Sequence, residues 1–592
     1  MSKTRRRTAP YIDQVLRQRR QGGWSARLRA ALSLLLSAAL TVQPVLAQSV
    51  PIVATPGGGT SVGVADNGVP IIDIARPNGA GLSQNRYDRF GVGAEGAILN
   101  NATDELSLSQ LGGLVQGNPN LLGTSGARVI LNEVTGTSRS TLEGALEVHG
   151  RGADVIVANP NGITCNGCGF INTPRVTLST GVPEISADGR VERLRVTGGD
   201  ILIGSRGADL RSSDVFDLVA RQIRLEGPVA AGEKLGLTAG RVVFDYTSRE
   251  ASSLPGDASD APEVAIDSTL LGGMQAGQIQ ILATEAGAGV RMRGDMAAHT
   301  GQMTLTADGK LVLRRAEAKG SVTLRSVSDG VRVETSLFSE AAIELRAVTA
   351  VELAAGATVT SASDVALAAT DIGLEAEALA GAGVGRDGTL GTTGRLAVSA
   401  DKLVAKADAR LLAGSALDIS ADRIALAGAA DPGTSAATLV VRDRLTVHAW
   451  EIEAGAARVR AGGAFTLGSD QTLILTGGDY AAGGPLLVEA AGLLSSADFA
   501  SDKAITLRTL AGDLESRGVV RAGAEGLFAE SAGRLVNTGL LRALGTLRLA
   551  AAAQLETGNS STIAAGADLE LEADGMALSL IHISEPTRLR RI

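Results

Sequence analysis

Aromatic residues, cysteines and histidines are scarce in this 592-residue chain. Phe, Trp and Tyr together make up 2% of it, and it has two cysteines and four histidines. A globular core of this size normally contains more aromatic side chains, because each buries a large area. Beyond residue 50 no apolar run approaches the roughly 18 residues of a membrane-spanning helix. The widely separated histidines favour no catalytic arrangement and no metal site, so we expect no enzyme active site, metal or cofactor.

A basic surface is also missing from the body of the chain. The formal net charge is −8, and the arginines cluster only near the two ends. Because nucleic-acid binding depends on neutralising phosphates with lysine and arginine, this distribution argues against a nucleic-acid partner.

Small aliphatic residues and glycine take the place of the missing aromatics. The chain has 75 glycines and is 44% hydrophobic. From about residue 290 a short motif of alternating aliphatic residues returns, most often every 20 residues and sometimes after 30 or 40, as at 303–307, 322–324, 343–345, 417–419, 505–507 and 547–549. Period-2 alternation between glycine-rich turns predicts strands, and a unit this short buries its apolar face only by stacking on its neighbours. The pattern predicts an all-β fold, a parallel β-helix of roughly 25 coils. Leucine-rich repeats share the period, but their asparagine ladder is absent.

The first 47 residues have the pattern of an export signal. A basic segment at 1–29 precedes an apolar stretch at 30–40, and small residues ending at Ala47 stand before Gln48. This order is typical of a secretory signal cleaved between Ala47 and Gln48. A membrane anchor is the alternative, but an apolar stretch of about 11 residues is too short to span a bilayer.

Two similar turns mark the less regular segment from 48 to 290. They are Asn118-Pro119-Asn120-Leu121 and Asn159-Pro160-Asn161-Gly162. Asparagine tolerates left-handed backbone and bonds its own main chain, while proline fixes φ at the next position. Taken alone, these turns are interpreted as two corners of a β-helix.

The strings around these turns carry a resemblance to a known family. They are GLSQNRYDRF (81–90), ILNN (98–101), LGGLVQG (111–117), ILNEV (130–134), ADVIVA (153–158), ITCNGCGFINT (163–173), RVTLSTG (175–181), FDLVAR (216–221) and LGGM (271–274). In order and spacing they resemble the secretion domain of filamentous haemagglutinin-like exoproteins, which use two-partner secretion (TPS).

The resemblance implies a right-handed parallel β-helix with an N-terminal TPS cap domain. It also implies that an outer-membrane β-barrel of the TpsB type recognises this domain in the periplasm and exports the chain to the cell surface or the medium. In the family both Asn-Pro-Asn motifs matter for secretion. That role carries over to Asn118, Pro119, Asn120 and Leu121, and to Asn159, Pro160, Asn161 and Gly162.

Cys165 and Cys168 form a C-x-x-C pair. This spacing is compatible with a redox centre, half of a metal site or a small disulfide loop. No helix is predicted there to lower a thiol pKa, and the nearest histidine, His149, adds at most one zinc ligand. Because an exported chain passes through an oxidising periplasm, we prefer a Cys165–Cys168 disulfide. A subset of the resembled family has the same pair.

Arg293-Gly294-Asp295 is the tripeptide that integrins recognise. A chain this rich in Gly, Arg and Asp often contains it by chance, and here it falls in a predicted repeat strand. We interpret it as a chance match, with a receptor contact as the alternative.

The last residues depart from the repeat. After Met576 the chain turns basic and loses the repeat spacing. We interpret residues 578–592 as a non-native tail that looks like the translation of a sequencing adapter; a genuine basic tail is the alternative. The expected organisation is a signal at 1–47, a TPS domain at 48–290, β-helical repeats at 291–577 and this tail.

Two functions are compatible with that organisation. The first is a secreted adhesin whose rod presents surfaces to a host or bacterial receptor. The second is the stalk of a contact-dependent growth inhibition toxin, or of a cytolysin, whose C-terminal effector is missing here.

Overall fold

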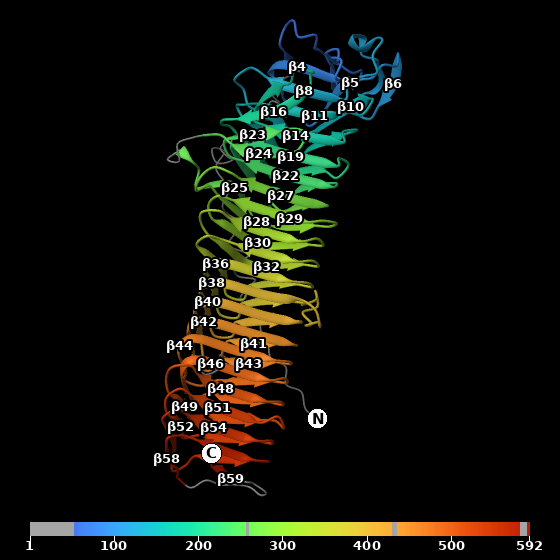
Figure 1. Cartoon of the computed structure of the whole chain (residues 1–592). Coiled ribbons are helices and arrows are strands. Elements are labelled where there is room, and N and C mark those ends of the chain that lie inside the picture. Colours follow the sequence, from blue (N-terminus) through green and yellow to red (C-terminus); the bar gives the residue numbers. More distant parts are fainter. Residues whose placement is uncertain (1–51, 256–259, 429–434, 580–588, 592) are drawn as a thin grey trace, which may run out of the picture. The chain divides into compact units, whose positions relative to one another are not determined.

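The computed structural model describes residues 52–255, 260–428, 435–579 and 589–591. Residues 50–592 form one compact unit in which strands stack along a single column (Figure 1). Nearly all pairings in the column are parallel and in register, and each coil passes in turn through three ladders, sheets 1, 2 and 3. The predicted parallel β-helix is therefore confirmed.

Six long strands bend from sheet 1 into sheet 2, and three bend from sheet 2 into sheet 3. The first group is β36 (Val365–Leu374), β38 (Arg395–Ala405), β40 (Ala416–Leu426), β42 (Arg444–Ala454), β44 (Phe465–Leu475) and β46 (Leu486–Ser495). The second group is β28 (Gly289–Ala298), β30 (Leu311–Ala318) and β32 (Val331–Ser339).

The remaining strands each belong to one sheet. Sheet 1 contains β4 (Leu82–Arg89), β8 (Val129–Val134), β11 (Asp154–Ala158), β14 (Arg175–Ser179), β19 (Val215–Ala220), β22 (Lys234–Ala239), β27 (Gln278–Ala283), β29 (Met303–Ala307), β31 (Val322–Ser326), β33 (Ile343–Arg346), β48 (Ile505–Thr509), β51 (Leu527–Ser531), β54 (Leu547–Ala551), β57 (Leu569–Glu572) and β59 (Leu589–Arg591). Sheet 2 contains β9 (Ser140–Leu142), β12 (Ile163–Cys165), β17 (Asp200–Ile203), β20 (Gln222–Leu225), β25 (Val264–Ser268), β34 (Ala350–Leu353), β49 (Leu514–Ser516), β52 (Leu535–Asn537), β55 (Gln554–Thr557) and β58 (Gly575–Ala577). Sheet 3 contains β3 (Pro70–Asp73), β5 (Ala97–Asn101), β10 (Ala145–Gly150), β13 (Cys168–Ile171), β18 (Ala208–Leu210), β21 (Val229–Ala231), β26 (Met274–Ala276), β35 (Thr358–Ser361), β37 (Leu379–Ala382), β39 (Arg410–Ala413), β41 (Thr438–Val441), β43 (Arg458–Ala461), β45 (Asp479–Ala482), β47 (Asp498–Ser501), β50 (Val519–Ala522), β53 (Leu540–Ala543) and β56 (Thr562–Ala565).

A few elements do not continue the three parallel ladders. They are β1 (Val53–Ala54), β2 (Ser61–Val64), β6 (Leu106–Ser109), β7 (Gly113–Gln116), the short 3-10 helix η1 (Pro119–Leu121), β15 (Val182–Ile185), β16 (Val191–Val196), β23 (Val242–Asp245) and β24 (Ala251–Ser253). Of these, β1 and β2 pair antiparallel with β4 and β3. Among the described residues no helix is long and apolar enough to cross a membrane.

The core fills the space between the three sheets. In β29 the burial pattern alternates, so Met303, Leu305 and Ala307 point inward while the threonines between them lie nearer the surface. Each fully buried leucine or isoleucine stabilises the stack by about 1.5–3 kcal/mol relative to an exposed one. The expected alternation of inward aliphatic and outward polar residues is correct.

The solenoid has about 21 turns, fewer than the roughly 25 expected. The difference arises because several coils carry long insertions. Leu82 and Val129, paired on neighbouring strands of sheet 1, are 47 positions apart. The extra residues of this coil include the hairpin β6–β7 and η1. The stack also has no break near residue 290, since β28 continues the ladders from both sides. The segment expected as a cap is thus the first part of the same solenoid.

Candidate secretion interface

The first Asn-Pro-Asn turn joins neighbouring coils through a buried side chain. Asn118 Nδ2 donates to the carbonyls of Ile74 (2.9 Å) and Asn100 (2.8 Å), and its Oδ1 accepts from the amide of Asn120 (2.9 Å). Pro119 then starts η1, and the Leu121 side chain is fully buried. The asparagine amide therefore satisfies one backbone carbonyl of the preceding coil and one of its own coil while it fixes its own turn.

The second turn repeats this arrangement. Asn159 is fully buried, and its Nδ2 donates to the Ser138 carbonyl and the Ser140 hydroxyl, both at 2.9 Å. Its Oδ1 accepts from the amide of Asn161, also at 2.9 Å. Gly162 closes the turn at φ +103°, where a Cβ would lie 2.5 Å from Arg139 Nη1. A side chain there would be strained and would displace Arg139, so the position requires glycine.

A four-stranded antiparallel sheet covers the outer face of sheet 1 in this region. Its strands run in the order β15–β16–β23–β24, and Leu194 and Phe244 pack on Leu131, Ile156 and Val219. Sheet 1 is consequently buried on both faces here. This double burial explains why β11 and β19 are almost entirely apolar instead of alternating, with Asp217 the charged residue inside β19.

A buried ionic cluster fastens that outer sheet to the solenoid. Asp217 in β19 pairs with Arg175 (3.0 Å) and with Arg249 (2.7 Å), and its side chain is only 2% exposed. The Arg175 guanidinium also lies 3.9 Å from the centre of the Tyr246 ring. Beside it, burial raises the pKa of Asp154 against the opposing effect of Arg175. A buried carboxylate with two guanidinium partners holds its neighbours in one geometry.

The hairpin β6–β7 is bound to β10 through hydrogen bonds to Glu147. Glu147 is buried and accepts hydrogen bonds from the Ser109 hydroxyl (2.7 Å) and from the amides of Gln110 (2.8 Å) and Leu111 (2.9 Å). Burial lowers the pKa of His149, whose Nε2 lies 2.9 Å from Ser107 Oγ. Three leucine side chains of the hairpin are exposed to solvent: Leu106, Leu108 and Leu114.

Cys165 and Cys168 are joined by a disulfide, with their Cα atoms 5.3 Å apart. Both side chains face the core, Cys165 at the end of β12 and Cys168 at the start of β13, so the bridge closes the corner between sheets 2 and 3. His149 lies on β10. Within the described ranges no group of three or more His, Cys, Asp or Glu side chains is placed to hold a metal ion.

Arg293-Gly294-Asp295 lies inside β28 rather than on a protruding loop. The amides of Arg293 and Gly294 donate to Ser268 Oγ at 2.9 and 3.1 Å, and the Asp295 carboxylate pairs with Arg314 of the following coil. Gly294 is buried, and a Cβ at this position would lie 2.4 Å from backbone atoms of Gly272. The tripeptide is thus an ordinary corner of the stack.

The predicted cleavage site, Ala47 and Gln48, lies outside the described residues, as does most of the 578–592 segment. Leu589–Arg591 forms β59 and pairs in parallel with β57. Both sequence interpretations stay predictions.

Comparison with known proteins identifies the family of this part of the chain. Residues 47–313 match the family model of the TPS secretion domain. The chain belongs to the two-partner secretion exoproteins. A crystal structure of a filamentous haemagglutinin secretion domain has 30% sequence identity to this chain. The matched region covers 54% of this chain and 99% of the crystallised domain, with a TM-score of 0.44.

Curated relatives of this two-partner secretion exoprotein are much longer. A tRNA nuclease CdiA of Escherichia coli is 48% identical over 295 residues, which are 50% of this chain and 9% of that protein. A 16S rRNA endonuclease CdiA of Enterobacter cloacae is 38% identical over 441 residues, which are 71% of this chain and 13% of that protein. The chain therefore spans about a tenth of the length of these relatives.

Sequence reasoning found the two Asn-Pro-Asn turns of the secretion domain but missed its ionic cluster. Asp217 stands in the FDLVAR string, where an acidic residue inside a continuous apolar strand was a visible signal. Arg175 and Arg249 gave no such signal, because nothing in the sequence indicates that they pair with a carboxylate 42 and 32 positions away.

Proposed function

We propose that this exoprotein crosses the outer membrane through a β-barrel partner of the TpsB type and reaches the cell surface or the medium. The observation that supports this most directly is the TPS secretion domain at residues 47–313. The two buried asparagine turns support it further, because the Asn118 bond to the Ile74 carbonyl and the Asn159 bond to the Ser140 hydroxyl each join consecutive coils of that domain. We propose that Asn118 and Asn159 serve secretion by fixing these turns, while Pro160 and Asn161, which are exposed, meet the transporter.

A secretion assay tests this proposal. A fragment of residues 1–313 is expressed in a Gram-negative host with and without the cognate barrel, and periplasm and medium are compared by immunoblot. We expect export only with the barrel, and we expect Asn159→Ala to accumulate in the periplasm. Arg325→Ala changes an exposed rod residue, and it is compared as the control with Asn159→Ala when both variants are made in the full chain. Equal amounts in the medium without the barrel would refute the proposal.

After export, we propose that the rod acts as an adhesin and presents binding surfaces to a host or bacterial cell. Stacked coils supply stiffness and reach, at about 4.8 Å per turn. Adhesion of cells that display the chain, compared with cells that lack the barrel, tests this role. No difference in adhesion between the two strains would contradict it.

A second candidate is the stalk of a contact-dependent toxin. It is favoured because the similarity to the Enterobacter cloacae relative covers 71% of this chain, more than residues 1–313 can supply, and so extends into the rod. Sequencing through the locus tests the candidate. A reading frame that continues into a toxin module beside a small immunity gene would support it, whereas repeats running to a stop codon would favour the adhesin.

A further inference from the structure

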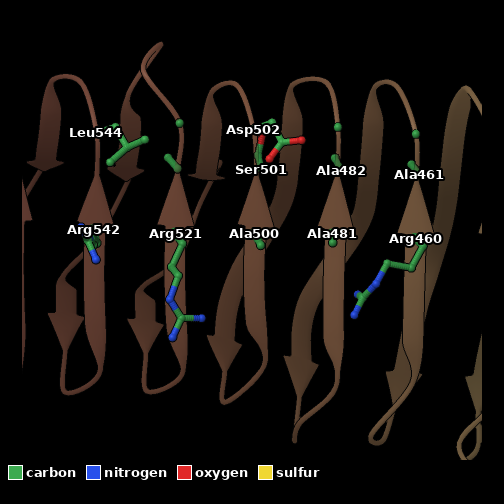
Figure 2. Close-up of a pocket in the computed structure, with 14 residues that line it drawn as sticks. Arg460, Ala461, Ala481, Ala482, Ala500, Ser501, Asp502, Arg521, Arg542 and Leu544 are labelled. Carbon is green, nitrogen blue, oxygen red and sulfur yellow. The ribbon is translucent and has the colours of Figure 1, made fainter.

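A groove of about 770 Å³ crosses the outer face of sheet 3 in the rod. Its floor is a column of in-register residues on β43, β45, β47, β50 and β53, which Figure 2 shows side by side. Along this column the residues are Arg460, Ala481, Ala500, Arg521 and Arg542. The two alanines leave a shallow flat bed between an arginine at one end and two at the other.

The two arginines at one end carry uncompensated charge. Arg521 and Arg542 are Cα partners on neighbouring strands, so their side chains leave the sheet about 5 Å apart. Both are exposed, and within the described residues neither has a hydrogen bond or an ion pair. Arg460 at the other end differs, because it pairs with Asp479. Like charges directly opposite one another destabilise a sheet, so an anion bound between Arg521 and Arg542 would relieve their repulsion.

The rim of the groove limits how much negative charge a ligand can carry. Asp502, in the turn after β47, is exposed at this rim (Figure 2). Its carboxylate accepts hydrogen bonds from hydroxyl groups and repels a second anion. A ligand that suits both features has one acidic group for the arginine pair and hydroxyl groups near Asp502.

The position of the groove argues against a peptide as its occupant. An extended peptide normally binds by adding a strand to an open sheet edge, where backbone groups are unpaired. Here the groove lies on the face of sheet 3, whose backbone groups are already used in the parallel ladder. A saccharide needs no backbone partners and lies flat on a floor of small side chains.

We propose that this groove binds an acidic saccharide chain whose carboxylates are separated by uncharged sugars. Arg521 and Arg542 hold one carboxylate, the alanine bed supports the neighbouring sugars, and Asp502 accepts from their hydroxyl groups. The arginine pair supplies charge-assisted hydrogen bonds, which are the strong ones in such a site. The biological use of the site rests on the proposed adhesin, but binding itself is measured on the purified chain and so stands or falls independently of secretion.

A binding titration tests the proposal. The probe is a fluorescently labelled hyaluronan oligosaccharide, which has a carboxylate on every second sugar, and a neutral chitin oligosaccharide of equal length is the comparison. We expect saturable binding of the acidic probe and none of the neutral one. Replacing both arginines (R521A with R542A) should weaken binding at least about tenfold, because two charge-assisted contacts are lost.

Two further variants separate the groove from general charge. Ala500→Glu places a carboxylate on the floor and should weaken binding at least about tenfold, whereas Arg325→Ala removes an exposed arginine of sheet 1 and should change it less than about twofold. Circular dichroism confirms that each variant is folded. Equal losses for Arg325→Ala and the groove variants would overturn the proposal, as would stronger binding of a densely sulfated polymer or of DNA than of hyaluronan.

Discussion

The secretion domain up to residue 313 and the rod that follows it run through the same three sheets, yet their corners are held by different chemistry. In the secretion domain, buried asparagines reach across coils, and Asp217 binds two arginines beneath an added sheet. In the rod, serines at the corners make the hydrogen bonds between coils. Ser339 Oγ donates to the Gly320 carbonyl of the preceding coil at 2.8 Å, and ion pairs such as Arg332–Glu352 lie at the surface.

One solenoid thus serves two purposes with two kinds of corner. Most rod corners are short, so most coils have about 20 residues and repeat with little change, although the longer corner between β37 and β38 sets the paired residues Val365 and Leu396 apart by 31 positions. Secretion-domain corners are individually built, because each long insertion must be anchored to the stack. We therefore expect substitutions at matched positions to cost more in the secretion domain than in the rod, and four measurements test this.

The largest effect is expected for Asp217→Ala. The change leaves Arg175 and Arg249 mostly buried without their carboxylate, which should lower the local free energy of unfolding by about 3–5 kcal/mol. Hydrogen exchange read by mass spectrometry measures it in peptides over β14, β19 and β23. Protection that is unchanged in these strands would contradict the role assigned to the cluster.

Asn159→Ala should come next. Two hydrogen-bond partners, the partly buried Ser138 carbonyl and the buried Ser140 hydroxyl, lose their donor, at a cost of about 2–3 kcal/mol. The matched rod variant Ser339→Ala removes one corner donor and should cost about 1 kcal/mol. Hydrogen exchange at residues 136–162 and 318–341 compares the two. Equal losses would mean that asparagine corners are no more demanding than serine corners.

Reduction of the Cys165–Cys168 disulfide should have a smaller effect. The bridge spans a sequence separation of three, so by chain entropy it contributes about 2 kcal/mol, less than a bridge across a long loop. Exchange of the amides at 163–171, with and without reductant, measures the change. Loss of protection throughout the secretion domain would show that the bridge has a wider role.

The smallest effect is expected for Glu352→Ala in the rod. Like Asp217, Glu352 pairs with an arginine (Arg332 at 2.9 Å), but both side chains are more than a third exposed and solvent screens the pair. The free energy of unfolding should fall by less than about 1 kcal/mol. Denaturant titration followed by circular dichroism checks this. A loss comparable to that of Asp217→Ala would remove the contrast between the two regions.

Local sequence patterns were sufficient to predict the repeating part of the protein. Aliphatic and polar residues alternate, the turns are rich in glycine and the period is near 20 residues. These features favour a stack of coils, because a strand such as Met303–Ala307 buries its apolar face only against neighbouring coils. The Asn-Pro-Asn turns were recognisable for a similar reason, since the backbone preference of each residue is local.

The tertiary structure alone decided which distant residues meet. The turn chemistry of Asn159 is local, but its donation to Ser138 and Ser140 depends on the coil beneath it. The same holds for Asp217 with Arg249, and for the arginine pair Arg521–Arg542, whose register follows from the exact number of residues in the intervening coil. Insertion lengths set that register, and no local pattern encodes which side chains a coil of given length brings together.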